Sequence, residues 1–127
     1  PVKFYSLDKK YPAFNDLKNI IFKTEGIEGS LRQLVSEYAG IELAFIYGSY
    51  AKGKERGSSD IDIVVVGSFP RDEFTLKLRI LESRLNREAN FSSYTKTEFY
   101  KESKKKGGFL NMVIKGKVIL LKVNLDD

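Results

Sequence analysis

Two apolar runs separated by a polar segment dominate the hydrophobic pattern of the chain. Residues 41–47 are almost wholly apolar, and a second apolar run, residues 63–66, follows two closely spaced aspartates, Asp60 and Asp62. Short continuous apolar runs are typical of strands that are buried on both faces. We therefore predict two core strands, over residues 41–47 and 60–66, joined by a polar loop that contains glycine and serine.

Helical periodicity accounts for much of the remaining chain. Ser30 with Gln33, and Thr95 with Glu98, have the spacing of a capping box at the start of a helix. Gly26 is well placed to end a helix that precedes it. Helices are predicted, in chain order, over residues 13–24, 30–38, 71–85, 95–105 and 109–114.

Three other segments are predicted to be extended. Residues 87–94 and 117–123 are typical of strands, and residues 1–7 of a short strand or an arm. Within the first of these strands, Glu88 and Asn90 share one face, because side chains alternate along a strand.

The order of these elements predicts a mixed α/β (α+β) fold, in which a small mixed β-sheet carries helices. We assign residues 1–12 to an N-terminal arm or to the remnant of an upstream domain. Residues 13–127 are predicted to form a single domain.

The composition narrows the chemistry that this domain could perform. The 127 residues include no histidine and no cysteine, and they carry a formal net charge of +5. Disulfides, thiolate metal sites and histidine bases are therefore excluded, so catalysis would depend on carboxylates, lysines, hydroxyls and metals that prefer oxygen ligands. The positive charge favours anionic partners such as nucleotides or nucleic acid. No apolar run reaches transmembrane length, so we expect no membrane span and a cytoplasmic location.

The start of the polar loop is a candidate phosphate site. Gly48 and Ser49 directly follow the first core strand, and Lys52 lies close behind them. A glycine lets the backbone approach a ligand, and the N–H groups that follow it would face a phosphate. The alternative is a tight surface turn with solvated cations, and short glycine motifs alone do not decide between the two.

Asp60 and Asp62 are candidate metal ligands. Two residues apart on a strand, they point to the same side, about 7 Å apart along it, and hard divalent cations prefer such oxygen ligands. The alternative is that they cap loop amides or pair with Lys52 or Arg56. Together with the glycine–serine pair between two core strands, the aspartates favour a functional site.

Two short motifs carry a resemblance to a known superfamily: GSYAKG at residues 48–53 and SDID at residues 59–62. They resemble the polymerase-β-like nucleotidyltransferase superfamily, and in particular its minimal nucleotidyltransferase (MNT-type) domains. The resemblance implies a nucleotidyltransferase-like fold, an NTP substrate such as ATP, and two Mg²⁺ ions, which Mn²⁺ could replace. It implies that Gly48, Ser49, Lys52 and Ser59 bind the nucleotide phosphates and that Asp60 and Asp62 bind the metals.

The family also uses a third carboxylate on a later strand, and here the sequence departs from the pattern. Asn90 occupies the matching position; its carbonyl could bind a metal, but it is neither charged nor a base. Glu88 lies one pleat earlier on the same face and could substitute for it. The alternative for Glu88 is a salt bridge with a neighbouring arginine such as Arg87.

A second resemblance concerns partners. YSL at residues 5–7 and YPAF at residues 11–14 are similar to the junction at which a winged-helix DNA-binding domain precedes such a nucleotidyltransferase. This domain would lie upstream of Pro1, where the chain opens without a methionine. Small members of the family also act with a helical partner protein, as in toxin–antitoxin pairs, so we expect such a partner or a homodimer.

Three functions remain open at this point. The first is transfer of a nucleoside monophosphate from an NTP to a hydroxyl acceptor with two Mg²⁺ ions. The second is a catalytically impaired, nucleotide-binding regulatory module that works with a partner protein or a DNA-binding domain. The third is direct binding of nucleic acid through lysines, for which the alternative is a solvated helix end; these are Lys101, Lys104, Lys105 and Lys106.

Overall fold

The computed structural model describes residues 20–21, 26–53 and 60–124. The predicted arm, residues 1–12, lies outside the described residues. The elements in chain order are β1 (Ile20–Ile21), α2 (Ile27–Ser36), β2 (Ile41–Tyr47), α3 (Gly48–Ala51), β3 (Ile61–Gly67), α4 (Arg71–Leu85), β4 (Ala89–Tyr94), α5 (Lys96–Ser103), α6 (Phe109–Lys115) and β5 (Val118–Val123).

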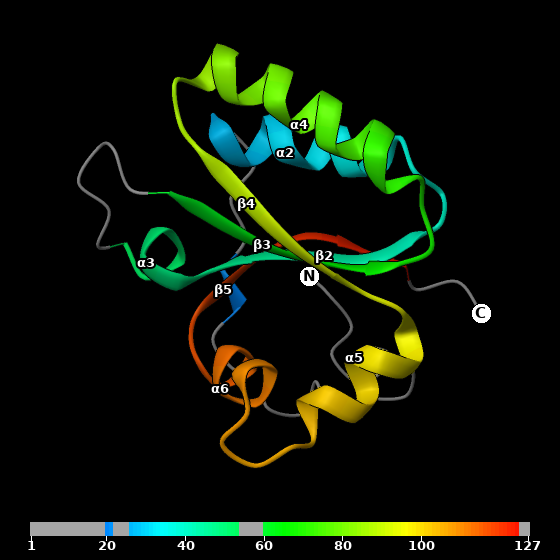
Figure 1. The fold of residues 1–127 in the computed structure, drawn as a ribbon. Coiled ribbons are helices and arrows are strands. Elements are labelled where there is room, and N and C mark those ends of the chain that lie inside the picture. The colour runs from blue at the N-terminus through cyan, green and yellow to red at the C-terminus, as the bar shows by residue number, and fades with distance from the viewer. Residues whose placement is uncertain (1–19, 22–25, 54–59, 125–127) are drawn as a thin grey trace.

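Within the described residues the strands form one mixed sheet of five strands, in the order β1-β5-β2-β3-β4. The pairs β1–β5 and β3–β4 are parallel, and the two pairs that β2 makes with β3 and β5 are antiparallel. Helices α2 and α4 cover one face of the sheet, and α5 and α6 lie against the other (Figure 1). The predicted fold, a small mixed sheet that carries helices, is confirmed.

The strands bury side chains on both faces, as the continuous apolar runs predict. In β3, Ile61, Ile63 and Val65 belong to the apolar cluster beneath α2 and α4. Val64 and Val66 point the other way, into a second cluster with residues of α5 and α6. Asp62 therefore projects from the α5–α6 face, because side chains alternate along a strand.

The strongest local patterns predict their elements well. Helix α4 has the predicted bounds, and the two core strands differ from prediction by at most one residue. The capping box is also confirmed: the Glu98 amide donates to the Thr95 hydroxyl, and the Thr95 amide donates to the Glu98 carboxylate.

Two predictions near the start of the chain are wrong. Ile20 and Ile21, placed in a helix over residues 13–24, instead form a strand beside Val118 and Ile119; the other residues of that helix lie outside the described part of the chain. The pairing supplies hydrogen bonds from a remote strand, and β-branched residues suit it.

Ser30 is not an N-cap, because α2 already begins at Ile27. Gly26 takes the cap position with φ 67°, a conformation that glycine adopts without strain. Helix α2 thus starts one turn earlier than predicted, and Glu28 becomes part of it.

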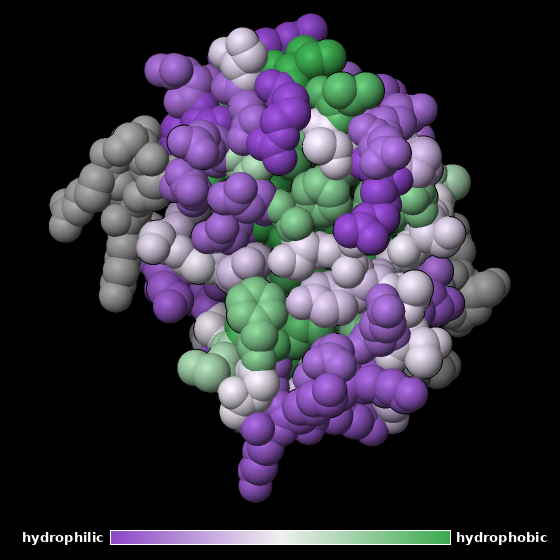
Figure 2. Space-filling view, viewed as in Figure 1, coloured by the Kyte–Doolittle hydropathy of each residue, from purple (hydrophilic) through white to green (hydrophobic). Residues whose placement is uncertain are grey.

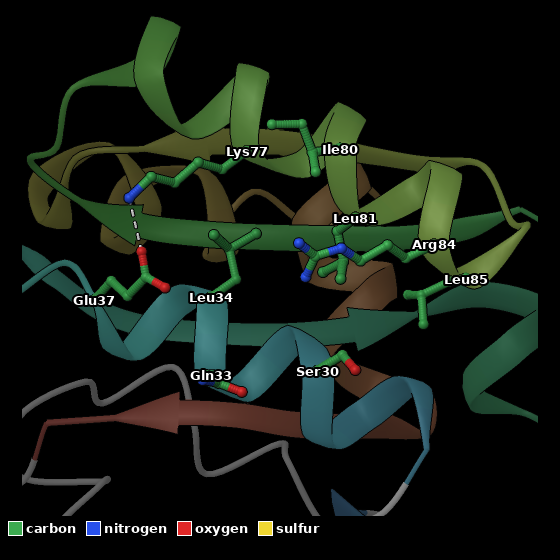
Figure 3. A pocket seen from close by; sticks show the side chains of 9 residues that line it. All are labelled: Ser30, Gln33, Leu34, Glu37, Lys77, Ile80, Leu81, Arg84 and Leu85. Atoms are coloured by element: carbon green, nitrogen blue, oxygen red, sulfur yellow. Dashed lines mark hydrogen bonds and ion pairs between the residues drawn. The ribbon is translucent and has the colours of Figure 1, made fainter.

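Helices α2 and α4 enclose a hollow of about 380 Å³ on their side of the sheet. Leu34 and Leu81 lie at its centre, and the Lys77 ammonium donates to the Glu37 carboxylate at 2.7 Å across one end (Figure 3). This hollow lies on the face opposite to that of Asp62.

None of the described helices is long and apolar enough to cross a membrane.

At the far end of the β2–β3 pair, the backbones at Gly67 and Gly40 approach each other closely. A Cβ on Gly67, which has φ 141°, would lie 2.0 Å from the carbonyl oxygen of Gly40. We predict that Gly67→Ala lowers the free energy of unfolding by roughly 3 kcal/mol, the upper part of the usual range for point substitutions. Urea unfolding measures this change.

Gly53→Ala is the matched control. Gly53 also has a positive φ, 74°, but no described atom lies within 4 Å of its added Cβ. It should therefore cost only the conformational term, about 1 kcal/mol. Equal losses in the two variants would contradict the backbone contact at Gly67.

Candidate active site

The candidate site lies where β2 ends and β3 and β4 begin. In the sheet, Tyr47 pairs with Asp62, and Asp62 pairs with Asn90. All three side chains project from the α5–α6 face, since their neighbours along each strand belong to the opposite cluster. The fold thus brings Asp62 and Asn90 side by side from segments far apart in the sequence.

Gly48 lies directly against the Asp62 carboxylate. It has φ 77°, and a Cβ built on it would lie 3.1 Å from Asp62 Oδ2. A larger residue would be strained by the backbone conformation and would displace this oxygen. The predicted phosphate loop therefore meets one of the predicted metal ligands, Asp62.

The other predicted phosphate-binding residues differ in their placement. Ser49 is exposed in the single turn of α3, and Lys52 is exposed directly after that turn. Lys52 lines a hollow together with Gly48. Ser59 lies outside the described residues.

Asp60 and Asp62 form an electrostatically strained pair. Burial raises the pKa of Asp62, and the negative charge of Asp60 raises it further, whereas a hydrogen bond from Asn90 lowers this pKa. The Asn90 amide also donates to Asp60 Oδ2 at 3.3 Å. Asn90 thus bridges the two aspartates as a hydrogen-bond donor, but it brings no positive charge to offset theirs.

The side-chain oxygens of Asp60, Asp62 and Asn90 are suitable ligands for a divalent cation. Two neighbouring carboxylates repel each other, and a cation between them removes this repulsion; carboxylate and amide oxygens are also the ligands that Mg²⁺ and Mn²⁺ prefer. Asp60 and Asp62 would hold the metal, and Asn90 could add its carbonyl oxygen if the amide turned. Among the described residues, no group of three or more acidic side chains is close enough to hold a metal.

Glu88 does not join the aspartates in such a group. Its backbone carbonyl accepts a hydrogen bond from the Ile61 amide at 2.9 Å. Its exposed side chain lines a separate hollow beside the end of α4, with Arg79 and Arg87 among the other lining residues. Its catalytic role stays a prediction.

The sequence did not reveal what holds α3 in place. The Tyr50 hydroxyl donates to Glu28 Oε2 at 2.6 Å, and both side chains are buried. The Arg87 guanidinium lies over the Tyr50 ring, 5.4 Å from its centroid. The one available signal was an acidic residue in the first turn of α2, which is more commonly a favourable helix charge than a buried partner.

The raised pKa of Asp62 has a consequence for stability. A carboxyl whose pKa is higher in the fold than in the unfolded chain destabilises the fold while it is charged, and this penalty disappears as pH falls through the folded pKa. We predict that Asp62→Asn, in EDTA, is more stable than the original chain at about pH 8, with a gain that shrinks toward about pH 4. Urea unfolding across this range measures the difference, and a variant that is less stable throughout would contradict the assignment.

A family model described as "Polymerase beta, Nucleotidyltransferase" matches residues 30–124. No curated protein matches the chain in sequence.

Two solved structures share the fold at low sequence identity. One is a crystal structure of a toxin–antitoxin with AMP-PNP, 18% identical, with a TM-score of 0.54 over 78% of this chain and 75% of that one. The other is a mutant of the toxin–antitoxin MntA-HpeT, 16% identical, with a TM-score of 0.52 over 76% of this chain and 73% of that one. Since the family match extends over most of the chain, from Ser30 to Asn124, the protein belongs to the polymerase β nucleotidyltransferase family.

Proposed function

We propose that the protein transfers a nucleoside monophosphate from an NTP to a hydroxyl acceptor and releases pyrophosphate. The observation that carries this proposal is the contact between Gly48 and the Asp62 carboxylate. It supports one site for the glycine–serine loop and Asp62, as an in-line displacement at phosphorus requires.

In this reaction, one group of residues binds the triphosphate and another holds the metals. Gly48, Ser49, Lys52 and Ser59 bind the triphosphate, and Asp60 and Asp62 hold two Mg²⁺ ions, or Mn²⁺. When bound, the metals supply charge neutralisation for the attacking and leaving oxygens. The acceptor oxygen forms a bond to the α-phosphorus, the bond to pyrophosphate breaks, and the hydroxyl proton leaves to a base. Asn90 cannot be that base, because an amide does not accept a proton near neutral pH.

The similar structures support two further parts of the proposal, the nucleotide and a partner protein. One of them holds AMP-PNP, which supports ATP or a related NTP as the substrate. Both are toxin–antitoxins, which supports a partner protein for this chain, with a homodimer as the alternative. A winged-helix DNA-binding domain upstream and a cytoplasmic location complete the proposal.

Asn90 favours a second candidate function. A site with two carboxylates and one amide could bind a nucleotide and a metal without turnover, and so act as a regulatory module. Glu88 would rescue catalysis only if its side chain left its present hollow.

An assay of pyrophosphate release tests the enzymatic function. The protein is incubated with each NTP, Mg²⁺ and candidate acceptors, namely proteins, RNA ends and small hydroxyl compounds. Asp60→Ala and Asp62→Ala should each lower the rate by at least about 100-fold, because each removes a metal ligand. Glu102→Ala, an acidic residue on α5 away from the site, is the control. Release that persists in both aspartate variants would contradict the proposal.

Asn90→Asp separates the two candidates in the same assay. If the original chain binds NTP with Mg²⁺ but shows no turnover, and Asn90→Asp gains turnover, the regulatory module is the native function. If the original chain turns over and Asn90→Asp is faster, the enzyme is native and the third ligand limits its rate.

A further inference from the structure

We propose that Lys117, outside the two sequence motifs, forms with Lys52 a subsite for the terminal phosphates of the NTP and for the pyrophosphate that leaves. This inference rests on the proposed function, because it names which end of the substrate lies where. It concerns a hollow of about 270 Å³ between α3 and α6.

The order of residues along one edge of the sheet is the first observation. Strand β5 runs antiparallel to β2, with Ile119 opposite Ile46, so Lys117 lies at the edge where β2 passes into Gly48. The next strands, β3 and β4, begin at this edge directly after Asp60 and Glu88. The edge therefore carries a cation, the glycine loop and then carboxylates, in that spatial order.

This order fits the charge distribution of a triphosphate held in line. The α-phosphorus, where the bond breaks, belongs beside the aspartates that hold the metals. The other two phosphates then extend past Gly48, toward the cationic end of this edge. These two phosphates therefore lie in the hollow beyond Gly48, which is lined by both Lys52 and Lys117.

The lining of the hollow suits a polyphosphate. Its described residues include two lysines and no acidic side chain; the rest are Tyr47, Gly48, Phe109, Met112, Val113 and Gly116. The Lys52 side chain approaches the end of α6, with its Cε 4.0 Å from the position of a Cβ on Gly116, the residue before Lys117. Neither ammonium forms a hydrogen bond or ion pair with another described residue. Both are therefore available to an anion.

The apolar wall strengthens such an interaction. The Tyr47 and Phe109 rings meet edge to face, with centroids 5.5 Å apart. Figure 2 shows apolar side chains at the surface between the sheet and α6, beside polar ones. Ammonium groups next to a low-dielectric wall attract developing negative charge more strongly than they do in water. The hollow is also near the lower limit of small-molecule sites, a size for part of an NTP rather than for all of it.

Calorimetric titration with inorganic tripolyphosphate tests the subsite directly. The titration uses the Asp60→Asn/Asp62→Asn variant in EDTA, so that neither metal nor turnover contributes. Adding Lys117→Gln should weaken binding roughly tenfold, since one charge-assisted contact is lost. Lys117→Arg should restore most of it, and Lys115→Gln, the same charge change on α6 outside the hollow, should change binding less than about twofold.

Titrations with adenosine and AMP show whether Lys117 contacts the terminal phosphates or the nucleoside end of the nucleotide. Binding of both should be unaffected by Lys117→Gln. If Lys117→Gln leaves tripolyphosphate binding unchanged, or weakens adenosine as much as tripolyphosphate, the subsite is overturned. If no variant of the chain catalyses transfer but tripolyphosphate still depends on Lys117, the proposed reaction fails and the subsite stands.

Discussion

The contact between the Gly48 backbone and the Asp62 carboxylate is the constraint on which the site depends. It follows from the register of β2 and β3, in which Tyr47 pairs with Asp62. A shift of one residue would turn Asp62 toward the apolar cluster beneath α2 and α4, where an unpaired carboxylate is costly. The buried isoleucines and valines of β3 therefore fix the position of the aspartate as well as the core.

One face of the sheet supports the fold, and the other carries the candidate site. Helices α2 and α4 close one face over a large apolar cluster, and from that side Glu28 holds Tyr50 and thereby α3. The α5–α6 face is closed only in part, and its open edge carries Asp62 beside Asn90, with a cationic hollow on the other side of Gly48. A rigid, buried layer thus supports a polar edge on which ligands can bind.

The sequence predicts those features that depend on local patterns. Continuous apolar runs, the periodicity of α4 and the Thr95–Glu98 capping box all describe interactions between near neighbours, and the structure has them. The strand of Ile20–Ile21 depends on a partner almost a whole chain length away, so local periodicity could not reveal it. In the site, a hairpin-like succession of two strands was enough to bring Gly48 to the aspartates. The places of Glu28 and Lys117 depend on packing and on the register of β5, which no local pattern records.

The coupling between metal binding and nucleotide binding is the most direct test, because the contact between Gly48 and Asp62 joins the nucleotide site to the metal site. Calorimetric titration with a non-hydrolysable NTP analogue, with and without Mg²⁺, measures it. We predict that Mg²⁺ tightens binding by at least about tenfold in the original chain, a coupling of about 1.4 kcal/mol, and that Asp62→Asn removes this gain. Equal affinity with and without Mg²⁺ in the original chain would contradict the account.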